Sequence, residues 1–193
     1  ASAPDYETKN SYSATVTVSD GTNSATQSIT VNVTDVYENV APSISGLSSI
    51  ITAAENQTSV VSVSATDGNG DSLTYSLSGT DASSLSISSS GVITFQSSPD
   101  YETKTSYSLN VNVSDGIVTT SQSITVNISN VNEAPSFASS ATFSAAENQT
   151  SIGSVSASDV DGDSLTYSVS GSEINISNSG VLTFASAPDY ETK

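Results

Sequence analysis

The chain repeats itself with a period of about ninety residues, and this repeat restricts the possible folds more than any other feature. The hexapeptide Ala-Glu-Asn-Gln-Thr-Ser begins at Ala54 and again at Ala146, and Gly-Asp-Ser-Leu-Thr-Tyr-Ser begins at Gly70 and again at Gly162. A unit of this length is large enough to bury a hydrophobic core of its own. The sequence therefore predicts tandem copies of one small domain.

The repeat divides the chain into three parts. Residues 41–133 form one complete unit, residues 1–40 form the C-terminal half of a preceding unit, and residues 134–193 form the N-terminal two-thirds of a following unit. The nonapeptide Ala-Ser-Ala-Pro-Asp-Tyr-Glu-Thr-Lys stands at both ends of the chain, which places both ends at the same point of the repeat. We expect the chain to be a window of a longer array of such domains.

Apolar residues alternate with Ser, Thr and Asn through most of the complete unit, and the longest such run extends from Tyr107 to Val113. Alternation with a period of two is typical of β-strands that have one buried and one exposed face. With a first strand near Ser43–Thr52 and a short one at Leu85–Ile87, we expect about seven strands. The pattern predicts an all-β fold of tandem seven-stranded Greek-key, immunoglobulin-like β-sandwich repeats.

The charge balance is strongly acidic, with 20 Asp and Glu residues against 3 Lys and Arg residues. All three bases are the lysines of the pentapeptide Asp-Tyr-Glu-Thr-Lys, which occurs three times. No basic patch can form to meet nucleic-acid phosphates or an anionic membrane surface, and no apolar run approaches the roughly 18 residues of a membrane span. We therefore expect neither nucleic-acid binding nor membrane insertion.

His and Cys are absent from the chain, and this restricts the chemistry that it could perform. Most pairs of a nucleophile and a base are impossible without them. A pair of carboxylates of the glycosidase type is the catalytic arrangement that the composition leaves open. We expect the chain not to be an enzyme.

Most of the acids lie in short repeated motifs at strand ends or in loops. Within each Asp-Tyr-Glu copy the two carboxylates, such as those of Asp100 and Glu102, share one side of an extended segment. Such a pair is costly to bury without a cation, and the loops of a sandwich converge at its two poles. Many oxygen ligands without His or Cys indicate calcium (Ca2+) over zinc or copper, and magnesium prefers fewer protein ligands.

Five acidic motifs recur in the same order along the chain. They are Ala54-Glu55-Asn56 with Ala146-Glu147-Asn148; Asp67-Gly68-Asn69 with Asp159-Val160-Asp161; Asp100-Tyr101-Glu102; Asp20 with Asp115; and the linkers Asp35-Val36-Tyr37-Glu38-Asn39 and Asn130-Val131-Asn132-Glu133-Ala134. In this order the chain resembles tandem cadherin repeats of the bacterial cadherin-like type, as in large surface adhesins. The resemblance covers the whole chain.

In that family calcium lies at each junction between repeats, and both neighbours contribute ligands. For the first junction the resemblance implies the ligands Asp5, Glu7, Asp35, Glu38, Asp67, Asn69 and Asp115. For the second junction it implies Glu55, Asp100, Glu102, Asn130, Asn132, Glu133, Asp159 and Asp161. Four further motif residues are candidate calcium ligands at the outer ends: Asp20, Glu147, Asp189 and Glu191.

The two junctions depart from the family pattern at different positions. Tyr37 replaces an Asn ligand and Asn69 replaces an Asp at the first junction, whereas Asn130 replaces an Asp at the second. A protonated phenol is a poor calcium ligand, and affinity rises with the number and charge of the ligands. We expect the first junction to bind fewer ions, or to bind them more weakly.

The resemblance implies a calcium-binding segment of a large extracellular adhesin, which acts in cell adhesion as a calcium-stiffened spacer or a homophilic stalk. The implied partners are the neighbouring repeats, and the same protein on another cell or a surface glycan. The implied location is extracellular or at the cell surface of a Gram-negative bacterium. The alternative is a carbohydrate-binding or accessory module of a secreted polysaccharide-degrading enzyme. Exposed aromatic residues on one sheet face would mark that alternative, and the chain contains no Trp.

Overall fold

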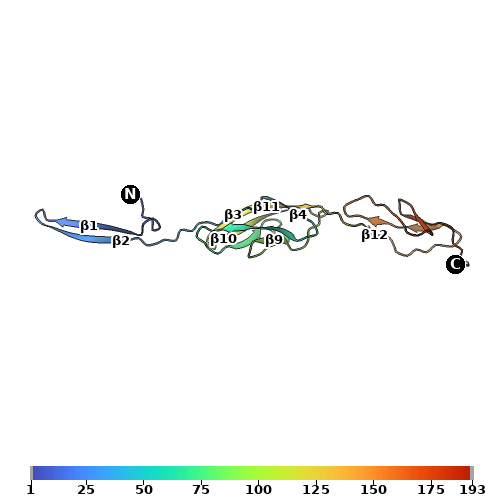
Figure 1. The fold of residues 1–193 in the computed structure, drawn as a ribbon, viewed down its shortest axis with the longest axis horizontal. Helices are drawn as coiled ribbons and strands as arrows, with labels where there is room; N and C mark the ends of the chain where they lie inside the picture. The colour runs from blue at the N-terminus through green and yellow to red at the C-terminus, as the bar shows by residue number, and fades with distance from the viewer. Residues whose placement is uncertain (1, 192–193) are drawn as a thin grey trace.

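The computed structural model describes residues 2–191, and the last two residues of the third Asp-Tyr-Glu-Thr-Lys copy, Thr192 and Lys193, lie outside the described part. Three bodies follow one another along one long axis: an N-terminal hairpin, a central sandwich and a C-terminal group of short strands (Figure 1). The predicted unit boundaries after residues 40 and 133 fall in segments without strands. Within the described residues, no helix is long and apolar enough to cross a membrane.

The N-terminal body is a two-stranded antiparallel hairpin. Strand β1 (Ser11–Ser19) pairs with β2 (Ser24–Asn32) along its whole length. Every residue of both strands is exposed. The hairpin therefore has no core of its own.

The central body is a β-sandwich of two layers. One layer is the four-stranded sheet β4-β11-β10-β7, and the other consists of the three-stranded sheet β5-β9-β8 and the pair β3-β6. Its elements are β3 (Ser43–Ser45), β4 (Ile50–Ala54), β5 (Ser59–Ser62), β6 (Ser64–Thr66), β7 (Thr74–Ser78), the 3-10 turn η1 (Ala82–Ser84), β8 (Leu85–Ile87), β9 (Val92–Phe95), β10 (Ser106–Ser114) and β11 (Thr119–Ser129). The predicted all-β sandwich is confirmed.

Nine strands build the central body instead of the predicted seven, because two expected strands are each divided into two. The run near Ser43–Thr52 becomes β3, which pairs with β6, and β4, which pairs in parallel with β11. Gly46 lies between them with a φ of +69°, a left-handed conformation that glycine adopts without a steric penalty. The run from Val61 to Ala65 is likewise divided at Val63 into β5 and β6.

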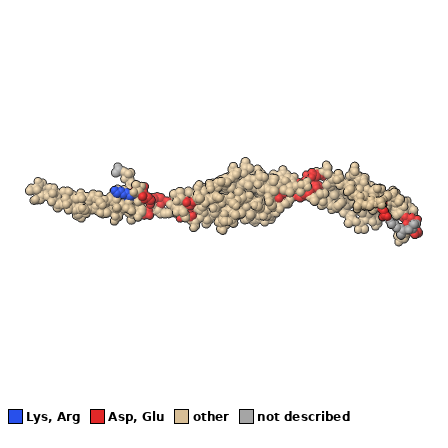
Figure 2. Space-filling model, in the orientation of Figure 1, with Lys and Arg blue, Asp and Glu red and all other residues tan. Residues whose placement is uncertain are grey.

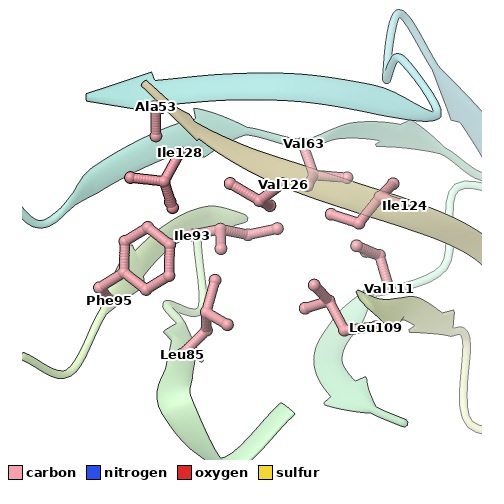
Figure 3. Close-up of a cluster of buried hydrophobic side chains, with 10 residues drawn as sticks. All are labelled: Ala53, Val63, Leu85, Ile93, Phe95, Leu109, Val111, Ile124, Val126 and Ile128. Carbon is pink, nitrogen blue, oxygen red and sulfur yellow. The ribbon is translucent and has the colours of Figure 1, made fainter. Parts of the chain in front are cut away.

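The hydrophobic core lies between the two layers (Figure 3). Alternate residues of β10 enter it, and Leu109 and Val111 are 3% and 0% exposed. The intervening Asn110 and Asn112 instead accept hydrogen bonds from two serines of β11, at 2.7 and 2.8 Å. The alternation predicted from the sequence is therefore the alternation between the core and the polar outer face.

The described part of the C-terminal body repeats one layer of the central sandwich and forms no four-stranded sheet. Its strands β12 and β14 pair as β3 and β6 do, and β13, β16 and β15 form a sheet like β5-β9-β8. Leu182 is 9% exposed, whereas its central counterpart Ile93 is fully buried. The bounds of these strands are β12 (Ser136–Phe137), β13 (Ser151–Ser154), β14 (Ala157–Ser158), β15 (Ile174–Ile176) and β16 (Val181–Phe184).

Candidate metal centre

Acidic side chains gather at the two connections between the bodies and near the C-terminal end (Figure 2). The two lysines in the described part of the chain are engaged elsewhere. Lys104 forms an ion pair with Asp81, an acid outside the repeated motifs, and the Lys9 ammonium lies 4.6 Å from the centre of the Tyr12 ring. The gathered carboxylates therefore repel one another unless another cation joins them.

The second connection, between the central and C-terminal bodies, brings together three glutamates. Glu55 follows β4, Glu102 lies in the Asp-Tyr-Glu turn before β10, and Glu133 lies in the linker after β11. Each offers one carboxylate oxygen, and these oxygens all lie within 4.8 Å of one another. Two oxygens on opposite sides of one calcium ion are about 4.8 Å apart. The three glutamates are thus close enough to share one ion.

Glu55 is the fixed member of this group, since it is only 3% exposed. Its two carboxylate oxygens accept the backbone N–H groups of Tyr101 and Val131, each at 2.7 Å. The chain turns at Asn56, whose φ is +60°, and the Asn56 side-chain amide donates to Glu133. One buried carboxylate therefore holds β4, the Asp-Tyr-Glu turn and the linker together.

The C-terminal body contributes Asp161, whose Oδ2 accepts the backbone N–H of Glu133 at 2.7 Å. Two further oxygens, Oδ1 of Asp161 and Oε2 of Glu133, are buried without a hydrogen-bond partner. A buried carboxylate oxygen without a partner is costly, and a bound cation would remove that cost. The chemistry of these two atoms, one from each side of the connection, suits a bound cation.

The crowding of acids affects the protonation of Glu102, which is exposed. Desolvation raises the pKa of Glu102 above its usual value, and the negative charges of Glu55, Asp161 and Glu133 raise it further. A raised carboxyl pKa means that the folded state disfavours the charged form. The charges of these three acids therefore act on Glu102 across the connection.

The Asp-Tyr-Glu copies are turns and not the extended segments expected from the sequence, and Asp5 and Asp100 shape the first two of them. The Asp100 carboxylate accepts the Thr103 hydroxyl at 2.9 Å and the Thr103 N–H at 3.1 Å, and Asp5 accepts the same two groups of Thr8 at 3.0 and 3.2 Å. The threonine hydroxyl is in each case the main cause that lowers the aspartate pKa. Both aspartates thereby fix the turn that presents the glutamate two residues later.

The remaining predicted ligands of the second connection lie around the group. Asp159 accepts the backbone N–H of Asp163 at 3.2 Å. The Asn132 side chain donates to the backbone oxygen of Glu133 at 3.1 Å, and Asn130 lies in the same linker. The structure therefore brings these residues to the second connection, but the shared group of oxygens comes from the glutamates.

Direct hydrogen bonds between linker and central body hold the first connection. The Asn39 side chain donates to Oδ2 of Asp115 at 2.9 Å, and the Val40 N–H donates to Oδ1 of Asn69 at 2.7 Å. The Asn69 amide donates in turn to the backbone oxygen of Glu38 at 3.1 Å. Two predicted ligands, Asn69 and Asp115, are thus engaged by groups of the protein itself.

Tyr37 adds another direct contact to the first connection. Its hydroxyl donates to the Asp71 carboxylate and approaches Oδ1 of Asn39 at 3.3 Å. The hydrogen bond to Asp71 is the main cause that raises the pKa of Tyr37 to about 12. The phenol therefore stays protonated at neutral pH and acts as a donor, which makes it unsuitable as a calcium ligand.

Asp67 is the member of the first connection that fits a cation best. Its Oδ1 accepts the backbone N–H groups of Asn69 and Asp71, at 2.8 and 3.3 Å. Its Oδ2 is buried without a hydrogen-bond partner. The first connection therefore has one such oxygen, and the second connection has two.

The N-terminal body supplies the other acids of the first connection. The backbone N–H of Glu7 lowers its own pKa, but desolvation, the contact with Asp5 and the charges of Glu38 and Asp35 outweigh this effect and raise it. Asp5, Glu38 and Asp35 therefore each lie near enough to Glu7 to affect its ionisation.

A third acidic group lies at the C-terminal end. Glu147, Asp189 and Glu191 each offer an oxygen within 4.8 Å of the others, and all three are exposed. The Tyr190 N–H donates to Glu147 at 3.0 Å, as Tyr101 does to the corresponding glutamate of the central body. Asp20 is separate from every group, because it lies in the turn between β1 and β2 and accepts two N–H groups there.

Several residues that make contacts at the two connections were not among the expected ligands. Asn56 donates to the three-glutamate group, and Asp71 accepts from Tyr37. The linker residues Asn39 and Val40 make two of the contacts at the first connection. The signal that could have found these two is in the sequence, because they have no counterpart in the linker before Ala134.

Comparisons with known proteins agree with this fold. Residues 39–129 match the bacterial Ig domain family. The chain is similar to the EC1-2 fragment of human protocadherin-24, with a TM-score of 0.56 and 22% identity over 81% of this chain and 82% of that chain. It is also similar to the EC1-3 fragment of mouse protocadherin-24, with a TM-score of 0.52 and 26% identity over 99% of this chain and 71% of that chain.

The EC22-24 fragment of mouse cadherin-23 is similar as well, with a TM-score of 0.52 and 25% identity over 97% of this chain and 68% of that chain. A search of curated protein sequences gave no match. The predicted likeness to cadherin repeats is therefore confirmed at the level of structure. The chain is an all-β protein with the immunoglobulin-like, cadherin-like sandwich fold, and residues 39–129 match the bacterial Ig domain family.

Proposed function

We propose that the chain binds calcium at the connections between its bodies and serves as a stiffened segment of a bacterial surface adhesin of the cadherin-like type. The observation that carries this proposal is the pair of buried oxygens without partners, on Glu133 and Asp161, at the edge of the three-glutamate group. They come from opposite sides of the connection, so one ion bound by both would join two bodies. The likeness to cadherin fragments and the match to bacterial Ig domains support the proposal.

The ligand chemistry favours calcium over other metals. The candidate site offers carboxylate and amide oxygens, and the chain contains no His or Cys for zinc or copper. Calcium accepts six to eight oxygens in flexible geometry, which suits ligands from several loops. Extracellular calcium modules bind in the range of about 0.1–1 mM, and outside the cell such concentrations are common.

The physical role of the ion is to replace repulsion by attraction at the connection. Glu55, Glu102, Glu133 and Asp161 carry like charges at short range, and this favours conformations that separate them. A divalent cation bound by both bodies removes that freedom. The row of bodies seen in Figure 1 then becomes a rod suited to a spacer or stalk on the cell surface.

Calorimetric titration tests the site directly. Calcium added to the chain should release or absorb heat, and the binding should saturate in the millimolar range or below. Glu133→Gln or Asp161→Asn should lower the calcium affinity of the tightest binding phase at least tenfold. Glu173→Gln removes the same charge outside the acidic groups and should leave the titration unchanged. An unchanged titration of both connection variants would exclude calcium binding at this site.

Thermal unfolding provides a second test. A ligand that binds only the folded state stabilises it, and calcium at about ten times the dissociation constant should raise the melting temperature by roughly 5–10 °C. Magnesium at the same concentration should raise it less. Identical curves in calcium and in chelator would count against the proposal.

The proposal includes no catalytic role. Binding to a glycan array distinguishes it from the carbohydrate-binding alternative. If the chain acts as a spacer in an adhesin, the chain itself should not bind saturably to any glycan of the array. Glycan binding that persists in chelator would favour the alternative. Hydrolysis of a glycoside that is lost in Asp100→Asn would instead revive the carboxylate-pair mechanism.

A further inference from the structure

The loop after β6 and its counterpart after β14 hold their linkers in the same way, except at one atom. Asn69 and Asp161 occupy the same place in the repeat. Each accepts a backbone N–H of its linker at 2.7 Å, from Val40 in one case and from Glu133 in the other. Nδ2 of Asn69 then donates to the backbone oxygen of Glu38 at 3.1 Å, whereas Oδ1 of Asp161 is buried without a hydrogen-bond partner. An amide in place of a carboxylate therefore decides whether the loop holds its linker directly.

The residue after Asn69 makes this amide chemically vulnerable. Asn69 is followed by Gly70, and the chain contains no other Asn-Gly pair. The backbone nitrogen of the residue after an asparagine can attack the side-chain amide carbon, and a side chain on that residue hinders the approach. Glycine lacks this side chain and permits close approach. Asparagine is also among the thermolabile residue types of proteins, so Asn69 is the asparagine of this chain most open to the attack.

The backbone around Gly70 leaves the attacking nitrogen available. The Gly70 N–H donates to the backbone oxygen of Asp67 at 3.4 Å, which is long for an N–H···O hydrogen bond. Beyond the adjoining residues, no atom lies within 4 Å of the place that a side chain of Gly70 would occupy. The same holds for Gly162 at the second connection, beside the complete central body. Water therefore has room beside this loop at either connection.

The contact with the linker favours the attack electronically. While the nitrogen of Gly70 bonds to Cγ of Asn69, negative charge develops on Oδ1. The backbone N–H of Val40 already donates to this oxygen at 2.7 Å. A donor aimed at an oxygen that gains charge stabilises the transition state.

We propose that Asn69 is a deamidation site, and that its reaction changes the first connection from one held by an amide to one that needs a cation. The deprotonated nitrogen of Gly70 attacks Cγ of Asn69 and closes a cyclic imide. The Cγ–Nδ2 bond breaks, and the amide group leaves as ammonia with a proton equivalent to the one that Gly70 lost. Water then opens either carbonyl of the imide, which leaves a carboxylate on aspartate or on isoaspartate and releases a proton. Water is the co-reactant, and nothing is oxidised or reduced.

The product reverses the contact between the loop and the linker. Nδ2 of Asn69 is a donor to the backbone oxygen of Glu38, and a carboxylate oxygen in its place would be a second acceptor. Two facing acceptors repel, so the linker loses a direct contact with the central body. The new carboxylate also joins the loop of Asp67, whose Oδ2 is buried without a hydrogen-bond partner. A cation would satisfy both groups; this last step rests on the proposed calcium binding, and the loss of the amide contact does not.

Peptide mass spectrometry of the full chain, incubated in chelator at neutral and at mildly alkaline pH, tests the reaction itself. The peptide that contains Asn69 should gain the mass difference between an amide and a carboxylic acid. The gain should be faster at alkaline pH, because Gly70 must lose its proton first. Conversion should be at least about tenfold faster at Asn69 than at any other asparagine, because glycine alone leaves its nitrogen open to approach. Asn69→Gln keeps an amide and Gly70 but would need a larger ring, so it should stay unconverted.

The variant Asn69→Asp tests the consequence, because it places the carboxylate in every molecule at once. In chelator, hydrogen exchange of the linker amides from Glu38 to Val40 should be several-fold faster than in the unsubstituted chain. Ser76→Asp adds the same charge on the exposed face of β7 and should leave this exchange unchanged. Added calcium should slow the exchange of Asn69→Asp again.

The outcomes separate this proposal from the proposed function. An Asn69 peptide that converts no faster than the other asparagines would overturn the deamidation site. Linker exchange that is the same in Asn69→Asp as in the unsubstituted chain would overturn its effect on the first connection. If the linker loosens in Asn69→Asp and calcium does not tighten it, the deamidation site stands and calcium binding at this connection fails.

Discussion

The acids crowded at the second connection should make the thermal stability of the protein depend on pH through Glu102. Its folded-state pKa is raised above the ordinary value of 4.5, first by desolvation and then by Glu55, Asp161 and Glu133. A carboxyl group with a raised pKa contributes stability that is fully present below its unfolded pKa and is lost as pH rises through the folded pKa. In chelator, the melting temperature should therefore increase as pH falls from 7 through the raised folded pKa of Glu102.

The variant Glu102→Gln removes this titration and should flatten the rise, as circular dichroism melts at several pH values would show. The pH dependence of stability that Asp100 contributes has the opposite sign, because Thr103 lowers the pKa of Asp100 below the ordinary value of 3.8. Stability from Asp100 is present above that value and is lost only as pH falls below it. If the melting temperature of Glu102→Gln rises as pH falls just as that of the unsubstituted chain does, other groups produce the rise.

Motif spacing is sufficient to name the acids of the second connection but not the groups that hold them. Glu55, Glu102 and Glu133 recur at fixed places in the repeat, and the structure brings their oxygens together. Asn56 was not predicted as a partner of Glu133, because its role depends on a left-handed turn that positions its amide. Contacts of this kind depend on the path of the backbone, which residue types alone do not specify.

Among the strands and their connections, Asp81 joins the segment before β8 to β10. Its carboxylate accepts the Lys104 ammonium and the backbone N–H of Ser108, the latter at 2.7 Å, and Lys104 is the main cause that lowers its pKa. Hydrogen bonds to charged groups contribute about 1.5–3 kcal/mol. Asp81→Asn should therefore destabilise the central body by roughly that amount in urea unfolding at pH 7.

The lowered pKa of Asp81 fixes the sign of its pH dependence. Its stabilisation is present above the ordinary value of 3.8 and is lost as pH falls through the lower folded value. The unfolding curves of the unsubstituted chain and of Asp81→Asn should converge at strongly acidic pH. Equal stability of the two proteins at pH 7 would show that the ion pair with Lys104 contributes nothing.

Equivalent core positions in the central and C-terminal bodies should respond differently to truncation. Ile93 of β9 is fully buried, and its counterpart Leu182 of β16 is 9% exposed beside an apolar hollow. Ile93→Ala should cost about 2–5 kcal/mol because the well-packed core cannot collapse around the cavity. Leu182→Ala should cost less, because Leu182 keeps some exposure beside the hollow and loses fewer packing contacts. Equal losses in urea titrations would contradict the view that Leu182 is less tightly packed than Ile93.

The strand pattern was predictable where one strand keeps the same partners along its length. The run from Tyr107 to Val113 alternates in sequence and is one strand, β10, in the structure. The run near Ser43–Thr52 was expected as one strand and is two, because the chain changes partners at Gly46. A pattern of alternation predicts which side chains of a strand are buried. It does not predict which neighbouring strand pairs with it.

At the scale of the whole molecule, the distribution of charge follows the order of the bodies. The strands carry Ser, Thr and Asn on their outer faces, and the acids are concentrated at the connections (Figure 2). Repulsion is therefore greatest at the points where the rod could bend. Under the proposed function, we therefore expect added calcium to change the stiffness of the molecule more than the stability of any single body.

The two connections should respond unequally to calcium. At the first, Asn39 engages Asp115, Val40 engages Asn69, and Tyr37 acts as a donor. The structure leaves one buried carboxylate oxygen without a partner there, on Asp67, against two at the second connection. Ligand number and charge determine calcium affinity, so the second connection should bind more tightly and the first should bend first as calcium falls.

Calorimetry of the full chain and three variants tests this inequality. Glu133→Gln should remove the tighter phase, and Asp67→Asn should remove only a weaker one. Tyr37→Asn restores the amide found at the second connection, removes the donor to Asp71, and should strengthen the weaker phase several-fold. Equal affinity at the two connections, or no effect of Tyr37→Asn, would mean that backbone carbonyls or water supply the ligand that the phenol does not.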